Sequence, residues 1–97
     1  MLTGKQKAHL RGLGNTLEPV VQVGKGGIVD TVVTQASDAL TARELIKGRI
    51  LKNCEAEPDE VAAELAAATG AELVQIVGRA FLLYRRSPDK PRIVLPE

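Results

Sequence analysis

Helix-like and strand-like segments alternate along this chain until its last third, where two strand-like segments follow one another directly. These two segments, AELVQIVG and AFLLYRR, meet at Gly78-Arg79, a tight connection that is typical of a β-hairpin. The earlier strand-like segments, VVQV and ELIKGRILKN, are each followed by a helix-like segment, as parallel strands require. Helix-linked strands followed by a hairpin predict a four-stranded mixed sheet with helices packed on it.

Three helices are expected around this sheet. Thr3 can cap a helix that runs to about Leu13, and GLGN ends it because Gly and Asn accept the left-handed conformation of a helix stop. The apolar anchors of this helix are Leu10, Leu13 and Leu17. A second helix follows GKGG, and its apolar face consists of Ile28, Val32, Val33, Ala36, Ala39 and Leu40. Pro58 opens the third helix, PDEVAAELAAATG, and Gly70 ends it.

The predicted order is therefore α-β-α-β-α-β-β in a single compact α/β domain over residues 1–97. The period of two in the second strand points Ile46, Gly48 and Ile50 one way and Lys47, Arg49 and Leu51 the other. The tail SPDKPRIVLPE contains three prolines and is expected to be extended, with RIVL as a candidate for a short edge strand.

The composition excludes several classes of protein. With one Phe, one Tyr and no Trp, the chain is poorly suited to RNA binding that stacks bases on several aromatic rings. A lone Cys54 and a lone His9 exclude an internal disulfide and a Cys/His zinc site. A Mg²⁺ site among the acidic residues 55–60 is possible, but no ligand pattern supports it, so no metal and no cofactor are expected. The start of the chain lacks a signal-peptide core, and no stretch approaches about 20 apolar residues. A cytoplasmic protein without a membrane partner is the simplest interpretation.

Charge is segregated along the chain although the net charge is only +1. Residues 1–53 carry eight Lys/Arg and four Asp/Glu, whereas residues 54–78 carry six Asp/Glu and no Lys/Arg. Residues 79–97 are basic again, with five Lys/Arg and two Asp/Glu. One basic and one acidic surface are therefore expected, although chance segregation in a small protein is the alternative.

The GKGG segment, Gly24 to Gly27, lies between the first strand and the second helix and is open to three interpretations. It can be a plain turn whose glycines supply positive φ. It can be a nucleotide-binding P-loop, but Ile28 and Val29 stand where that motif needs a hydroxyl side chain. It can be a G-x-x-G loop that binds a nucleic-acid backbone, formed by Gly24, Lys25, Gly26 and Gly27.

The third interpretation has a direct physical basis. Glycines lack a Cβ, so a sugar-phosphate chain can approach the main chain closely. The N–H groups and positive dipole end of the following helix attract phosphate, and Lys25 adds a charge. Asp30 counts slightly against it, because its carboxylate competes for the same helix end. Further basic residues could extend this surface: Lys5, Lys7 and Arg11 on the first helix, Lys47 and Arg49 on the second strand, and Arg79, Arg85 and Arg86.

Nothing in the sequence indicates catalysis. His9 has no Ser or Cys near it in sequence that would form a nucleophile pair, and Cys54 fits a small apolar role. The acidic residues Glu55, Glu57, Asp59 and Glu60 fit a loop and a helix start. A small hydrolase is therefore a distant alternative.

Together, LTGKQKAHLRGLG, PVVQVGKGGI, ELIKGRI and GAELVQIVGRAFLLYRR resemble the CRM domain (chloroplast RNA splicing and ribosome maturation), and most of all its stand-alone bacterial YhbY-like form. The resemblance covers about Leu2 to Leu95. It implies a four-stranded mixed sheet similar to the C-terminal domain of bacterial translation initiation factor three. It also implies RNA binding through Gly24, Lys25, Gly26 and Gly27, with Lys5, Lys7, Arg11, Lys47 and Arg49 as neighbouring basic residues.

The resemblance further implies a non-enzymatic role in maturation of the large ribosomal subunit, with ribosomal RNA precursor as the partner. A monomer without a small-molecule substrate is expected. Val29 stands where family members often have a Thr or Ser helix cap, so Asp30 is a candidate for that role. The main rival function is a protein-interaction adaptor that docks on a ribosomal protein through the acidic third helix.

Overall fold

Four strands form one mixed sheet in the order β1-β2-β4-β3 in the computed structural model of the chain, which describes residues 2–89 and 91–97. The elements are α1 (Gly4–Gly14), β1 (Pro19–Val23), α2 (Asp30–Arg43), β2 (Leu45–Ile50), α3 (Pro58–Thr69), β3 (Glu72–Val77) and β4 (Ala80–Tyr84). β1 and β2 are parallel and are connected through α2, whereas β4 is antiparallel to both β2 and β3. The predicted fold class, element order and mixed sheet are confirmed.

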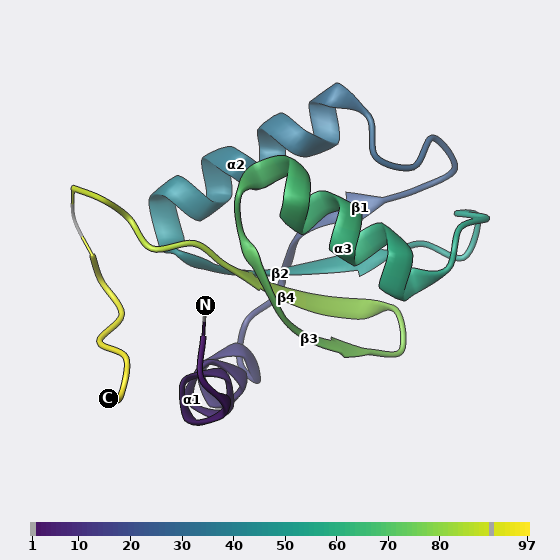
Figure 1. The fold of residues 1–97 in the computed structure, drawn as a ribbon. Coiled ribbons are helices and arrows are strands. Elements are labelled where there is room, and N and C mark those ends of the chain that lie inside the picture. The colour runs from purple at the N-terminus through teal and green to yellow at the C-terminus, as the bar shows by residue number, and fades with distance from the viewer. Residues whose placement is uncertain (1, 90) are drawn as a thin grey trace.

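The two faces of the sheet are covered to different extents. α2 and α3 lie across one face, and α1 lies on the other (Figure 1). The larger core fills the α2–α3 side and includes Leu40, Ile46, Leu65 and Phe81, all at most 1% exposed. The smaller core lies under α1 and consists of Leu10, Leu45, Val74, Leu82 and Tyr84.

Two glycines allow close packing inside these cores. A Cβ on Gly48 of β2 would lie 2.2 Å from Cζ of Phe81, the residue opposite it on β4. A Cβ on Gly14 would lie 2.4 Å from a methyl carbon of Leu82. Because carbon atoms pack at about 3.5–4.0 Å, only glycine fits beside these two side chains.

The ends of α1 differ partly from the prediction. Thr3 caps the helix as expected, in a capping box with Gln6. The predicted left-handed stop is wrong, because Asn15 is right-handed at φ −59°. Leu13 is not a core anchor, since it is 41% exposed. The helix instead ends where Gly14 packs against Leu82, and the chain turns through a hydrogen bond from the N–H of Leu17 to the carbonyl of Gly14.

The start of α2 resolves the question of its cap. Val29 is the N-cap residue and makes no side-chain hydrogen bond to the helix, and Asp30 is the first helical residue. The suggestion that Asp30 replaces the cap is therefore wrong, and Ile28 lies before the helix although it packs on the larger core. α3 matches its prediction, from Pro58 at its start to Gly70 in the left-handed conformation at its end.

The C-terminal tail is held by side chains and not by strand pairing. The predicted edge strand at RIVL is wrong, because residues 91–97 form no regular structure; Lys90 of this tail lies outside the described residues. The Glu44 carboxylate, which is fully buried, accepts hydrogen bonds of 2.5 to 2.8 Å from the N–H groups of Ser87, Arg92 and Ile93. Burial alone would raise the pKa of Glu44, but these N–H groups and the Arg86 charge hold it below its ordinary value.

Candidate nucleic-acid interface

The GKGG loop lies at the end of the sheet where three connections meet. β1 and β2 end side by side, with Val23 opposite Ile50, and the β3–β4 hairpin turns at the same end. We call this the loop end: the GKGG loop (residues 24–27), the loop after β2 (residues 51–53) and the hairpin turn (residues 78–79). The chain is tied together here by hydrogen bonds from the N–H of Leu51 to the carbonyl of Val23 and from the N–H of Ile50 to the carbonyl of Arg79.

The GKGG loop is a tight turn closed by a 3.0 Å hydrogen bond from the N–H of Gly27 to the carbonyl of Gly24. Only Gly27 has a positive φ, at +69°, so it is the one glycine of the loop that the backbone conformation requires. A Cβ on Gly24 or Gly26 would meet its nearest neighbours at 3.6 Å, which is ordinary van der Waals contact. The fold itself therefore explains one of the three glycines, and it leaves Lys25 exposed at the turn.

A row of four side chains crosses the sheet next to this loop. Pairing places them side by side, one from each strand: Gln22, Arg49, Ala80 and Val77. They share the face that carries α1, yet Gln22, Arg49 and Val77 are exposed. α1 therefore covers only part of this face, and the row at the loop end is open to solvent.

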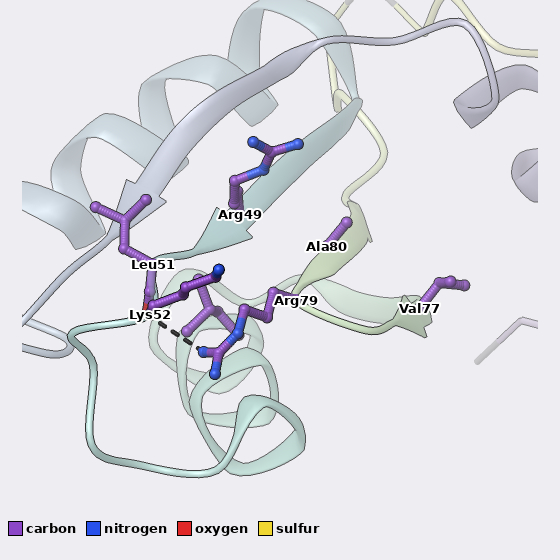
Figure 2. Close-up of a pocket in the computed structure, with 7 residues that line it drawn as sticks. Arg49, Leu51, Lys52, Val77, Arg79 and Ala80 are labelled. Carbon is purple, nitrogen blue, oxygen red and sulfur yellow. Dashed lines mark hydrogen bonds between the residues drawn. The ribbon is translucent and has the colours of Figure 1, made fainter.

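Three cations surround a pocket of about 520 Å³ at the loop end. Arg49 comes from β2, Lys52 from the loop after it and Arg79 from the hairpin turn (Figure 2). The Arg79 guanidinium donates a 3.4 Å hydrogen bond to the carbonyl of Leu51, which ties its side chain to the pocket wall. A second hollow of about 270 Å³ shares Val77 and Ala80 with the first and extends past Lys47 toward the end of α1.

The structure separates the predicted site residues into two groups. Gly24, Lys25, Gly26 and Gly27 come together with Arg49 at the loop end, and Lys47 lies one row further along the same sheet face. The helix that carries the other predicted residues, α1, begins at the opposite end of the sheet, where the N–H of Leu2 bonds to Glu72. Lys5 and Arg11 are exposed.

Lys7 of α1 lies near the first residue of β3. Burial would raise the pKa of Glu72, but the 3.0 Å hydrogen bond from the N–H of Leu2 and the charge of Lys7 help to lower it. Glu72 pairs with Tyr84 on β4, at the far end of the sheet from the hairpin turn. Lys7 is therefore remote from the GKGG loop.

Arg85, which was expected to extend the basic surface, is engaged in the fold instead. Its guanidinium donates to Ser37 and Thr41 of α2 and, at 2.7 Å, to the carbonyl of Thr69 at the end of α3. It thus joins the two helices on the side of the sheet opposite α1. Arg86 is exposed, and it follows β4 at the far end from the hairpin turn.

Sequence reasoning missed the pocket and two of its members, Lys52 and Val77, and gave Arg79 only a minor place. The signal for Val77 was the hairpin register, since a turn at Gly78-Arg79 sets Val77 opposite Ala80. The signal for Lys52 was its place directly after a strand parallel to β1. Without the strand order, these signals do not show that Val77, Lys52 and Arg79 meet at one end of the sheet.

Comparison with known proteins decides the family. The profile of the CRS1 / YhbY (CRM) domain matches residues 2–85. The chain belongs to this family. It is 46% identical over 96 residues to "Probable RNA-binding protein YqeI" of Bacillus subtilis, covering 99% of this chain and 100% of that protein. It is 34% identical over 95 residues to "RNA-binding protein" of Haemophilus influenzae, covering 98% and 95%.

A solved structure agrees with the fold. The solution structure of SAV1595 from Staphylococcus aureus, described as a candidate RNA binding protein, has a TM-score of 0.84 and 45% identity to this CRM domain. The match covers 99% of this chain and 100% of the other.

Within residues 2–89 and 91–97, no group of three or more His, Cys, Asp or Glu could hold a metal ion. Among those same residues, none of the helices has the length and apolar character needed to cross a bilayer.

Proposed function

We propose that this CRM domain is a non-catalytic RNA-binding protein that contacts the ribosomal RNA precursor during large-subunit assembly, as a cytoplasmic monomer. The GKGG loop binds the RNA backbone, and the cations of the loop end, Arg49, Lys52 and Arg79, extend the contact. The names of its relatives support RNA as the partner. The assembly role rests on the family resemblance.

The observation that carries the proposed site is the pair of glycines that the fold does not require. Gly24 and Gly26 have room for a Cβ and ordinary backbone conformations. Glycine costs conformational entropy relative to alanine, so its presence needs another reason. Close approach of a sugar-phosphate backbone to the loop is such a reason, and Lys25 between the glycines supplies the matching charge.

The proposed phosphate contacts predict how steeply RNA affinity falls with salt concentration. If four cations at the loop end (Lys25, Arg49, Lys52 and Arg79) each neutralise one phosphate of a single strand, the logarithm of the association constant falls with a slope of about −3 against the logarithm of salt concentration. Affinity then drops roughly fiftyfold between about 50 and 200 mM salt. Fluorescence anisotropy with ribosomal RNA fragments measures this slope. A slope near zero contradicts the phosphate contacts.

Gly27→Asp tests the location of the site, and Gly70→Asp is its matched control. Both glycines have φ +69°, and a Cβ on either would meet nothing within 4 Å. The two variants therefore share the same unfavourable positive φ and the same added charge, but Gly70 lies just before β3, at the end of the sheet away from the hairpin turn. We expect RNA binding to weaken at least about tenfold in Gly27→Asp, by lost close approach and added repulsion. Equal binding by the two folded variants would move the site away from the loop.

The adaptor remains the second candidate because the chain also exposes an acidic surface. Its exposed carboxylates are those of Glu55 and Glu57, just before α3, and of Asp59, Glu60 and Glu64 on α3. Such a surface repels RNA and attracts a basic protein. A gel shift with naked RNA distinguishes the two functions, because a pure adaptor gives no salt-sensitive shift.

A further inference from the structure

We propose that the pocket between the end of β2 and the β3–β4 hairpin binds one unpaired RNA base, next to the backbone contact at the GKGG loop. This inference rests on the proposed function and adds to it a preference for RNA with an unstacked nucleotide. The pocket is the one formed around Arg49, Lys52 and Arg79.

The lining of the pocket matches the two parts of a nucleotide. Three of its seven lining residues are cationic, none of the seven is acidic, and the others are Ile50, Leu51, Val77 and Ala80. Apolar side chains suit the faces of a base, and the cations suit its phosphate. The volume of about 520 Å³ falls within the range of about 300–1,000 Å³ that is usual for small-ligand sites.

A base can be held here without an aromatic ring. In single-stranded recognition, bases stack on guanidinium planes as well as on aromatic side chains. The Arg79 guanidinium is tied to the carbonyl of Leu51 by one of its N–H groups, which restricts the side chain before RNA arrives. Val77, 63% exposed on the sheet face, is a large apolar side chain that a stacked base would shield from water.

The pocket and the loop are close enough to act on consecutive nucleotides. A Cβ on Gly24 would lie 3.6 Å from a methyl carbon of Leu51, which lines the pocket, and 3.6 Å from Oδ1 of Asn53. One RNA strand can therefore pass its backbone over the GKGG loop and turn a neighbouring base toward Arg79. The open row of the sheet, which includes Arg49 and Val77, leaves this path free of α1.

The experiment compares two RNA hairpins that differ only in one base. The first carries a single bulged nucleotide, and the second carries an abasic nucleotide at the same place, with every phosphate kept. Base stacking contributes about 1–3 kcal/mol, so wild-type protein should bind the first at least about fivefold more tightly. Anisotropy titration at constant salt measures this ratio.

Substitutions then test whether the preference for the bulged base arises at the pocket. Val77→Glu places a carboxylate at the pocket wall, and Val94→Glu adds the same charge to another exposed valine, in the tail. We expect the ratio of the affinities for the bulged and the abasic hairpin to fall to about one in Val77→Glu and in Arg79→Gln. The ratio should stay at the wild-type value in Val94→Glu. Both valines are exposed, so folding is expected to be retained.

The outcomes separate the two proposals. Absence of salt-dependent binding to either hairpin would overturn the proposed function. Salt-dependent binding with a ratio of one in the wild type would overturn the base pocket and leave the backbone contact intact. A wild-type ratio that survives in Val77→Glu, or is lost equally in Val94→Glu, also overturns the pocket.

Discussion

Replacement of Gly48 by alanine should destabilise the domain strongly, because the Phe81 ring occupies the space of the new methyl group. The added Cβ would lie 2.2, 2.6 and 2.8 Å from three ring carbons. Since carbon contacts need about 3.5 Å, the ring or the strand must move by about 1 Å. Phe81 is 1% exposed and packed within the larger core, so it has no free space to enter. Overpacking of this kind costs typically 1–3 kcal/mol, and we expect about 3 kcal/mol here.

Thermal and urea denaturation followed by circular dichroism measure this cost. For a domain of this size, 3 kcal/mol corresponds to a fall in Tm of roughly 12–24 °C. Phe81→Leu removes the ring carbons that clash, so Gly48→Ala combined with Phe81→Leu should cost less than the sum of the single changes, by at least about 1 kcal/mol. A Tm for Gly48→Ala within a few degrees of wild type, or additive costs in the double variant, would refute the steric explanation.

Four other substitutions probe the rest of the fold. Glu44→Gln should cost about 2–3 kcal/mol, because an amide nitrogen then faces backbone N–H donors. Because the folded pKa of Glu44 is lowered, its stabilisation is present above the ordinary glutamate pKa and is lost as pH falls through the folded value; the melting temperature of the Gln variant should therefore depend less on pH below about 5. Gly26→Ala should leave stability unchanged or raise it by up to about 1 kcal/mol, whereas Gly27→Ala should lower it by about 1 kcal/mol through its positive φ; thermal melts of the pair compare them directly. Arg85→Met should lower stability by about 2 kcal/mol by removing its hydrogen bonds to α2 and α3, and RNA affinity of the folded variant should not change in an anisotropy titration.

The sequence was sufficient for the fold because local signals and burial pattern agree. Pro58 and Gly70 mark the ends of α3, and the alternation in β2 sends Ile46 and Ile50 to the core. Prediction failed where tertiary contacts override local preference. Asn15 is right-handed, and α1 ends where Gly14 packs closely on Leu82, a contact that no local pattern reveals.

The structure of the C-terminal tail was also mispredicted because a tertiary contact overrides local preference. RIVL has the composition of a strand, yet the sheet order β1-β2-β4-β3 leaves β1 and β3 at the edges, and neither takes it. The carboxylate of Glu44 binds the N–H groups of Arg92 and Ile93 instead. A buried glutamate that accepts hydrogen bonds from residues more than 40 positions away has no signature in the local sequence.

The candidate site was predictable in part, since GKGG and Arg49 could be read from spacing and alternation. The pocket could not be, because it needs Lys52 and Arg79 from two loops that only the sheet order brings together. The same order explains why Lys7 and Arg85 lie elsewhere, although they are equally basic in sequence. Charge patterning predicted that a basic surface exists, and strand topology decides which cations belong to it.

Residues at the two ends of the sheet are thus expected to contribute to different properties, stability at one end and RNA affinity at the other. At the far end, Glu44 and Arg85 have several hydrogen-bond partners each, so their loss should lower stability and leave RNA binding intact. At the loop end, Lys25 and Lys52 are exposed and Gly26 has room for a side chain, so changes at these three positions should lower RNA affinity and leave stability intact. Melting temperatures and RNA affinities measured on Arg85→Met and Lys52→Ala test this division. A loss of stability in Lys52→Ala comparable to that in Arg85→Met would show that the loop end also supports the fold.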